Sequence, residues 1–413
     1  MRCVPRWAAA FARTAAILVT GLAGLGAAAA LAGDKHYAPG ITDTEIKIGQ
    51  TMPYSGAASA WGADGLAELA YFNMLNDQGG VNGRKIRLIS LDDAYSPPKT
   101  VEQTRKLVEQ EQVAFIFSPL GTPTNTAIQK YLNERKVPQL FVATGASKWA
   151  DPKHFPWTMG WQPSYATEAR IYGRYILEHK PDAKIAVLFQ NDDYGKDYVS
   201  GLKEGLGDKY AKMVVGEASY EVTDPTVDSQ IVTLQATGAN VFVDIAGPKF
   251  AAQAIRKAYD IGWRPLHFLN TVGSAVGAVL QPAGVEKSVG IVTARYYKDP
   301  SDPQWRDDPA FQEWLAWMKK YNPDANVNDY YNVLGYNLAM TLVHVLRQCG
   351  DDLSRENIMR QAADIHDLAL PMLLPGVAVN TSPADFRPLK QMRLVRFDGQ
   401  TWHSFSELIG DEM

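Results

Sequence analysis

The chain has 413 residues and a formal net charge of −4 at pH 7, and 46% of its residues are hydrophobic against 21% charged. This length suffices for two to three domains of ordinary size with well-filled cores. Because the chain is slightly acidic and has no cluster of Lys and Arg, its composition predicts no nucleic-acid partner.

The first 32 residues have the pattern of a secretory signal peptide. Arg2, Arg6 and Arg13 precede a Gly/Ala-rich apolar stretch that ends in Ala-Leu-Ala at Ala32. A basic start, an apolar middle and a small-residue end predict cleavage near Ala32 and export to the periplasm. A retained membrane anchor is the alternative, but the apolar part is short against the ~20 residues that span a bilayer, and no later stretch is long enough.

Export changes the cysteine count and the charge. Cys3 leaves with the predicted signal peptide, so Cys349 remains alone and no internal disulfide is expected. The number of Lys and Arg residues falls from 41 to 38 against 45 Asp and Glu, which makes the net charge −7. The sequence therefore predicts an exported, mildly acidic protein.

Short apolar runs alternate with helical patterns in the first part of the exported chain. Strands are expected at 45–49, 84–91, 115–117 and 138–143, and helices at 65–76, 100–111 and from 122 onward. The helical segments have apolar residues at i, i+3 and i+4 spacing, whereas the strand segments are short and bounded by Gly, Pro or Asp. This alternation is typical of a doubly wound α/β domain.

Two of these strand ends carry the polar residues of a candidate binding site. The third strand gives way to Gly, Thr and Ser over 118–124, and the fourth does so over 144–147. Thr122 can cap the following helix, with Pro123 in its first turn. Hydroxyls and free N–H groups at a helix start attract a carboxylate or phosphate, and ligands of open α/β sheets bind at the carboxyl ends of strands. Either stretch alone fits an ordinary strand-to-helix turn, but together they favour a binding site.

The same alternation restarts after residue 163. We expect a long helix at 165–179, strands at 184–190, 212–220, 240–246 and 266–269, a crossing at 290–297, helices at 309–321 and 330–349, and a final strand from Lys390. We interpret this part of the chain as a second α/β lobe.

A series of motifs runs in order along nearly the whole exported chain. They are 46–49, the loop through Ser55, Gly56, Trp61 and Gly62, then 76–84, 118–124, 144–147, 190–195, and Gly335 with Tyr336. Together they resemble the Leu/Ile/Val-binding family of periplasmic solute-binding proteins, which serve ABC importers of the branched-chain amino acid type.

The resemblance implies a fold and a division of the chain. The implied fold is α/β, with two doubly wound lobes joined by three crossovers and a ligand cleft between them. Lobe 1 is expected to comprise 44–162 and 291–372, and lobe 2 to comprise 163–290 and 373–413. The crossovers are expected near 161–163, 289–292 and 370–376. The resemblance also implies a monomeric receptor that delivers its ligand to an inner-membrane permease.

The family's ligand contacts can be transferred to residues of this chain. The resemblance places the ligand carboxylate on lobe 1, beside Leu120, Thr122, Gly145, Ala146 and Ser147. It places Tyr54 and Trp61 at the mouth of the cleft, and Tyr194, Ala246, Thr271 and Val272 on lobe 2 over the rest of the ligand. These residues are the predicted ligand site.

One departure from the family concerns the ligand. Amino-acid binders of this family hold the ammonium group of the ligand with an acid that follows the strand corresponding to 266–269. Here the segment 270–274 has no carboxylate, and a buried ammonium group without a partner is costly. The sequence therefore predicts a carboxylate ligand that lacks an α-ammonium group.

Aromatic residues expected near the site suggest what the rest of the ligand is. Tyr54, Trp61, Trp161 and Tyr194 favour an aromatic acid. The alternative is a branched-chain or other hydrophobic amino acid, whose ammonium group would be held by Asp193 or Asp244.

Catalytic and metal-binding patterns are missing from the sequence. The seven His residues have no metal-ligand spacing, no Gly-x-Ser-x-Gly motif occurs, and Cys349 lies in a predicted helix among apolar residues. We expect a receptor with no metal and no cofactor rather than an enzyme. A ligand-sensing module and an exported hydrolase are the alternatives.

Overall fold

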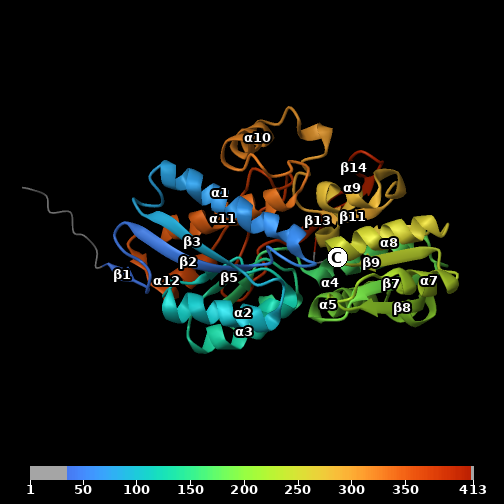
Figure 1. The fold of residues 1–413 in the computed structure, drawn as a ribbon, viewed down its shortest axis with the longest axis horizontal. Helices are drawn as coiled ribbons and strands as arrows, with labels where there is room; N and C mark the ends of the chain where they lie inside the picture. The colour runs from blue at the N-terminus through green and yellow to red at the C-terminus, as the bar shows by residue number, and fades with distance from the viewer. Residues whose placement is uncertain (1–34, 411–413) are drawn as a thin grey trace, which may run out of the picture. The chain divides into compact units, whose positions relative to one another are not determined.

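The computed structural model describes residues 35–410, so the predicted signal peptide and its cleavage near Ala32 lie outside the described residues. The described chain is built on two large sheets with helices packed on them (Figure 1), and it also has a separate pair of two-residue strands. None of the helices in this part of the chain combines the length and the apolar character that crossing a membrane requires.

The smaller sheet has five parallel strands in the order β3-β2-β4-β5-β6. Its strands are β2 (Glu45–Met52), β3 (Lys85–Asp92), β4 (Ile116–Phe117), β5 (Gln139–Val142) and β6 (Thr158–Gly160). Figure 1 shows α1 (Gly62–Asp77) on one face of this sheet, and α2 (Pro97–Arg105) and α3 (Thr122–Glu134) on the other. Strands β4 and β5 are fully buried and mostly apolar, as expected for strands that are covered on both faces.

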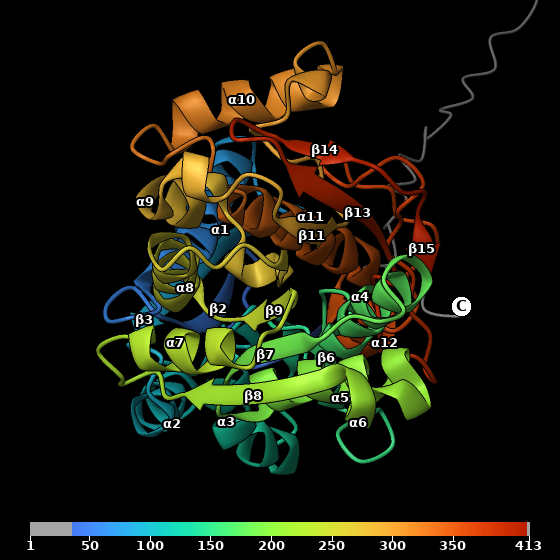
Figure 2. The same cartoon turned by 90° about the vertical axis from the view of Figure 1, so that its right-hand side faces the viewer.

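The larger sheet has eight strands, with the main order β14-β13-β11-β10-β9-β7-β8. Five of its strands pair in parallel: β7 (Ile185–Gln190), β8 (Val214–Tyr220), β9 (Val241–Ile245), β10 (Leu266–Leu269) and β11 (Val292–Arg295). The other three pair antiparallel: β13 (Gln391–Phe397), β14 (Trp402–Ser404) and β15 (Ile409–Gly410). Figure 2 shows β14 and β8 at the opposite edges of this sheet.

Helices flank the larger sheet and bridge its strands. They are α4 (Tyr165–His179), α5 (Asp193–Leu206), α6 (Tyr210–Met213), α7 (Asp228–Ala236), α8 (Pro248–Asp260) and α9 (Gln281–Ala283). After β11 the chain continues through α10 (Pro309–Tyr321), α11 (Tyr331–Cys349), β12 (Asp352–Leu353) and α12 (Arg355–Ala362). Helix α11 packs against α1, and β12 pairs with β1 (His36–Tyr37), before the chain returns to the larger sheet at β13.

The predicted α/β fold with two doubly wound lobes is confirmed, since the chain passes between two such layers after β6, after β11 and before β13. The lobe limits stay a prediction. The same holds for the second crossover, expected near 289–292, where β11 (Val292–Arg295) pairs with β10 and β13.

Most element boundaries follow the sequence pattern, and the exceptions have local causes. The helices predicted at 165–179 and 309–321 are confirmed residue for residue. The helix expected from 100 begins at Pro97, since proline fits a first helical turn, and it becomes a π-helix over Lys106–Gln110. The strand expected from 212 begins at Val214, because Tyr210–Met213 forms a helical turn.

Helices α4 and α5 approach each other closely through glycines. A Cβ atom at Gly201 would lie 2.2 Å from the carbonyl oxygen of Ala166, and one at Gly205 would lie 2.6 Å from that of Arg170. Both distances are too short for a real side chain, so only glycine permits this spacing. The two helices carry Glu168 and Tyr194, whose roles are described below.

Cys349, at the end of α11, is the single cysteine of residues 35–410. Its thiol is unpaired and buried, and burial raises the pKa of the thiol to about 12. It is therefore a core residue, as its apolar neighbours in the sequence suggest.

Candidate functional site

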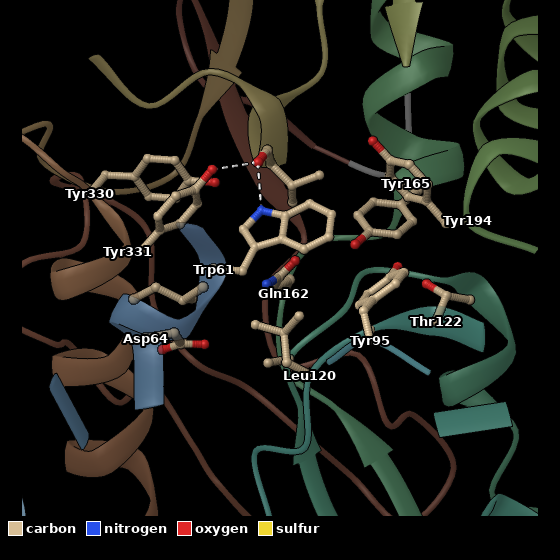
Figure 3. Close-up of a pocket in the computed structure, with 14 residues that line it drawn as sticks. Trp61, Asp64, Tyr95, Leu120, Thr122, Gln162, Tyr165, Tyr194, Tyr330 and Tyr331 are labelled. Carbon is tan, nitrogen blue, oxygen red and sulfur yellow. Dashed lines mark hydrogen bonds between the residues drawn. The ribbon is translucent and has the colours of Figure 1, made fainter. Parts of the chain in front are cut away.

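A pocket lies where loops of the two sheets meet the start of α11 (Figure 3); its empty volume is about 370 Å³ when the solvent space at its opening is included. Six of its fourteen lining residues are aromatic. The smaller sheet and its helices contribute Trp61, Asp64, Tyr95, Leu120, Gly121, Thr122 and Ala143, whereas the following segments contribute Gln162, Tyr165, Tyr194, Val272, Tyr330, Tyr331 and Leu334.

Trp61 forms the middle of the pocket wall and joins its two sides. It ends a short 3₁₀ turn that runs directly into α1, so its ring is held by the helix start. The indole Nε1–H donates to the carbonyl oxygen of Val272 at 3.0 Å, and the hydroxyl of Tyr331 donates to the same oxygen at 2.8 Å. The Trp61 ring also contacts that of Tyr95, with centroids 5.5 Å apart. These contacts close the pocket between residues of the two sheets.

Tyr194 forms the wall opposite to Tyr330 and Tyr331 in Figure 3. Its ring packs edge-on against Tyr165, with centroids 5.3 Å apart, and its hydroxyl donates to Asn270 Oδ1 at 3.0 Å. Burial raises the pKa of the Tyr194 hydroxyl well above its ordinary value. Tyr194 therefore offers a neutral ring to the pocket.

The start of α3 forms the polar part of the wall. Leu120 pairs with Ala143 in a parallel bridge, so the two strand ends singled out in the sequence are neighbours, as predicted. The Thr122 hydroxyl lies 2.6 Å from that of Thr144. The expected capping role of Thr122 is wrong: Gly121 is the N-cap residue, at φ 102°, a backbone conformation that favours glycine, and Thr122 is the first helical residue.

The predicted ligand site is divided in the structure. Trp61, Leu120, Thr122, Tyr194 and Val272 line the pocket. Gly145, Ala146 and Ser147 instead line a neighbouring hollow of about 630 Å³, where both the backbone N–H and the hydroxyl of Ser147 lie 3.0 Å from Asp197 Oδ2.

Tyr54, Ala246 and Thr271 lie outside the pocket lining, and each contacts other protein groups. The Tyr54 hydroxyl lies 2.6 Å from the Ser90 hydroxyl. The Ala246 carbonyl accepts a hydrogen bond from Asn270 Nδ2 at 2.9 Å. The Thr271 hydroxyl donates to the Ala294 carbonyl at 2.7 Å.

The two acids considered as ammonium partners also lie outside the pocket lining. Asp244 is fully buried on β9, where its Oδ2 lies 3.3 Å from His267 Nε2. Asp193 forms an ion pair with Lys148 at 3.0 Å. Both carboxylates thus have a partner within the protein.

The sequence analysis missed several pocket residues. Tyr330 is the N-cap residue of α11 and Tyr331 is its first residue, and the Tyr330 hydroxyl donates to the Thr271 carbonyl at 3.0 Å. A pair of tyrosines at a helix start was visible in the sequence, but nothing there placed it opposite Trp61. Asp64 was also visible, as an acid within the apolar first turns of a helix.

We expect Asp329, which precedes these tyrosines, to make stability depend on pH. Burial raises the pKa of its carboxyl to about 7, whereas the unfolded value is near 3.8. A raised carboxyl pKa means that the stability present at low pH is lost as pH rises toward 7. Between pH 5 and pH 8 the free energy of unfolding should therefore fall in both proteins by different amounts. The fall should be about 2–3 kcal/mol larger in the wild type than in Asp329→Asn.

Urea unfolding at the two pH values measures this difference. Asp324→Asn, which changes an exposed acid in the same loop, is the matched control and should follow the wild type. Equal pH dependence in Asp329→Asn and the wild type would contradict the assignment.

Comparison with known proteins identifies the family of this chain. The family model of periplasmic binding proteins matches residues 45–401. The chain is 24% identical over 319 residues to Leu/Ile/Val-binding protein homolog 1 of Brucella abortus (strain 2308), a match that covers 76% of this chain and 81% of that protein.

Two solved structures illustrate the fold similarity. A branched chain amino acid ABC transporter protein from Thermus thermophilus with bound valine superposes with a TM-score of 0.79 at 15% identity, over 90% of this chain and 97% of that one. A fatty acid ABC transporter substrate-binding protein from Thermomonospora curvata gives a TM-score of 0.74 at 22% identity, over 92% and 95% of the two chains. Both share the fold of this chain.

Proposed function

The chain belongs to the periplasmic binding protein family, as a solute-binding receptor of the branched-chain amino acid ABC importer type, and from this premise we propose that its ligand is a small carboxylic acid without an α-ammonium group. An aromatic acid fits the walls best. The receptor would be exported to the periplasm by its signal peptide and would deliver the acid to an inner-membrane permease. The family is one of receptors and not of enzymes.

The observation that carries the proposal is the missing ammonium partner on the larger-sheet side of the pocket. The segment 270–274 has no acid, and Asp193 and Asp244 are paired with Lys148 and His267. An α-ammonium group brought to this side would therefore be buried without a countercharge, which costs several kcal/mol. An acid without that group avoids this cost.

The polar wall at Thr122 suits the carboxylate. The first N–H groups of a helix have no intrahelical acceptor, and the positive end of the helix dipole favours an anion. Thr122 adds a hydroxyl at the start of the thirteen-residue helix α3. The Thermus protein binds valine and the Thermomonospora protein belongs to a fatty acid transporter. Valine and fatty acids are both carboxylic acids. Because a fatty acid has no α-ammonium group, the second relative supports the proposal.

The aromatic walls suit a flat apolar body. Trp61, Tyr95, Tyr165 and Tyr194 present rings to the space beside Thr122 (Figure 3). Aromatic pairs add roughly 0.5–1.5 kcal/mol each beyond the burial of their area. An aromatic acid would therefore gain more here than an aliphatic acid of the same size.

Contacts between residues of the two sheets would couple binding to closure. Beside the bond from Trp61 to Val272, Ser147 contacts Asp197, and Lys148 pairs with Asp193. A ligand that touches both sides favours the closed form by its differential affinity. The closed receptor would then be the form that the permease recognises.

A thermal-shift screen of unfolded and refolded protein, which carries no co-purified ligand, tests the proposal. We expect benzoate, hydroxybenzoates and cinnamate-type acids to raise the melting temperature, and leucine, isoleucine and valine to leave it unchanged. A ligand at a hundred times its Kd adds about 2.7 kcal/mol of stability, which is easily detected. Thr122→Val should weaken the binding of the best acid about tenfold or more, because a charge-assisted hydrogen bond is lost, whereas Thr122→Ser keeps the hydroxyl and serves as control. Stabilisation by leucine but not by aromatic acids would overturn the proposal.

A further inference from the structure

Helix α1 carries two buried carboxyl groups one turn apart, Asp64 and Glu68. Both side chains are fully buried. One oxygen of Glu68 accepts a hydrogen bond from the Gln50 amide, whereas neither oxygen of Asp64 has a hydrogen-bond partner. A buried polar group without a partner is rare in proteins and often marks a place where a ligand or water belongs.

Asp64 differs from Glu68 because it lines the pocket. Figure 3 shows its carboxyl near Leu120, on the side of the pocket away from Thr122. Helix α11 covers it from behind, since a Cβ atom at Gly335 would lie 2.9 Å from Asp64 Oδ1. The Asp64 carboxyl therefore lies between α11 and the pocket, with no hydrogen-bond partner for either oxygen.

The surroundings of the Asp64 carboxyl determine its protonation state. Burial raises the pKa of Asp64 well above its ordinary value, and no basic side chain acts against that shift. Burial and the charge of Asp64 also raise the pKa of Glu68. Hydrogen bonds with Ser118 and Gln50 lower that pKa and so oppose part of the shift. Two carboxyls this close disfavour each other's ionisation. These effects favour the protonated, neutral form of Asp64, which can both donate and accept a hydrogen bond.

We propose that the neutral carboxyl of Asp64 hydrogen-bonds an uncharged polar substituent, a hydroxyl or an arylamine, at the end of the ligand remote from its carboxylate. The inference rests on the proposed function and narrows it to hydroxy- or amino-substituted aromatic acids. Asp64 is then the residue that distinguishes these acids from their unsubstituted parents. A ligand with a cationic group at this end would need Asp64 to ionise beside Glu68, which the apolar surroundings oppose.

Isothermal titration with benzoate, 3-hydroxybenzoate, 4-hydroxybenzoate and 4-aminobenzoate tests the inference. In the wild type, at least one substituted acid should bind roughly tenfold or more tightly than benzoate, because a substituent that meets Asp64 satisfies a buried group. Asp64→Leu should abolish this preference, so that the substituted acids bind this variant no more tightly than benzoate does. Asp64→Asn, which has the shape and the hydrogen-bonding capacity of the neutral acid, should keep most of the preference.

The control and the outcomes separate this inference from the proposed function. Asp302→Asn changes a buried acid that caps a 3₁₀ turn and does not line the pocket, so it should keep the wild-type preference. If no aromatic acid binds the wild type, the proposed function fails. If benzoate binds and every substituent adds nothing, only the role of Asp64 fails. If Asp64→Asn loses as much as Asp64→Leu, the carboxylate is required in its ionised form, which overturns the inference. Circular dichroism confirms that each variant is folded.

Discussion

Replacing Trp61 with alanine should weaken ligand binding by two to three orders of magnitude. The Trp61 ring lies against Tyr95, and its N–H donates to Val272 across the pocket. The ring also reaches the larger-sheet side, where a Cβ atom at Gly247 would lie 3.1 Å from it. Truncating a buried Trp costs about 3–5 kcal/mol. Here most of that loss falls on the closed, liganded form, because Trp61 makes these contacts between residues of the two sheets.

Isothermal titration with the best acid of the screen measures the loss. Trp61→Phe keeps an aromatic ring and removes only the N–H; since Tyr331 donates to the same carbonyl oxygen, this variant should lose less than about tenfold in affinity. A Trp61→Ala protein that binds within threefold of the wild type would show that Trp61 is not part of the ligand site.

Replacing Glu168 with alanine should lower the free energy of unfolding by about 3–5 kcal/mol. Its carboxylate accepts three buried hydrogen bonds: from the Tyr172 hydroxyl at 2.5 Å, from the Tyr198 hydroxyl at 2.9 Å and from the Thr271 N–H at 2.7 Å. Alanine leaves the Tyr198 hydroxyl and the Thr271 N–H without this acceptor in the core, at a cost of about 1–3 kcal/mol each, whereas the Tyr172 hydroxyl can still donate to the Leu269 carbonyl at 3.1 Å. Glu168 thus fixes α4, α5 and the segment after β10 to one another.

Urea unfolding followed by circular dichroism measures this change, with Glu168→Gln as the isosteric control. Glutamine keeps an acceptor oxygen, so its loss should be about half as large. Glu168→Ala should also weaken ligand binding, because Thr271 is continuous with Val272 in the pocket wall. A loss of stability below 1 kcal/mol would mean that water replaces the carboxylate without cost.

The lobes could be predicted from the sequence because their signals are local. The spacing of apolar residues, and the Gly, Pro or Asp residues at the ends of a segment, predict each strand and helix, as the helix at Tyr165–His179 illustrates. The adjacency of Leu120 and Ala143 followed from one general rule, that parallel strands end at the same edge of a sheet. Trp61 was found through the family's motif and lines the pocket.

The remaining pocket residues could not be predicted because they depend on long-range packing. Tyr330 and Tyr331 reach the pocket only because α11 packs on α1. The burial of Asp64 depends on the same packing, with a glycine at position 335. The spacing of apolar residues within one helix or strand does not predict a contact between two distant helices.

The division of the predicted site has a cause in the backbone. The register of β5 with β6 shifts between Leu140 and Val142, and Phe141 has φ 55°. A shift of this kind redirects the side chains that follow. After the shift, Ala143 still lines the pocket, whereas Gly145, Ala146 and Ser147, which follow Thr144, line the neighbouring hollow. A bulge at a bulky apolar residue leaves no mark in the sequence pattern.

The burial of Cys349 has a practical consequence for optical labelling. A maleimide dye reacts with an accessible thiolate, and Cys349 offers neither the access nor the ionised form, given a pKa of about 12. Cys3 belongs to the predicted signal peptide. A cysteine introduced at Asp193, on the rim opposite Lys148, would therefore carry the dye on the exported chain without prior removal of a native thiol. Since this rim is where the two sides meet, the emission of such a dye would report how far the cleft has closed, and the receptor itself would become an optical sensor of its ligand.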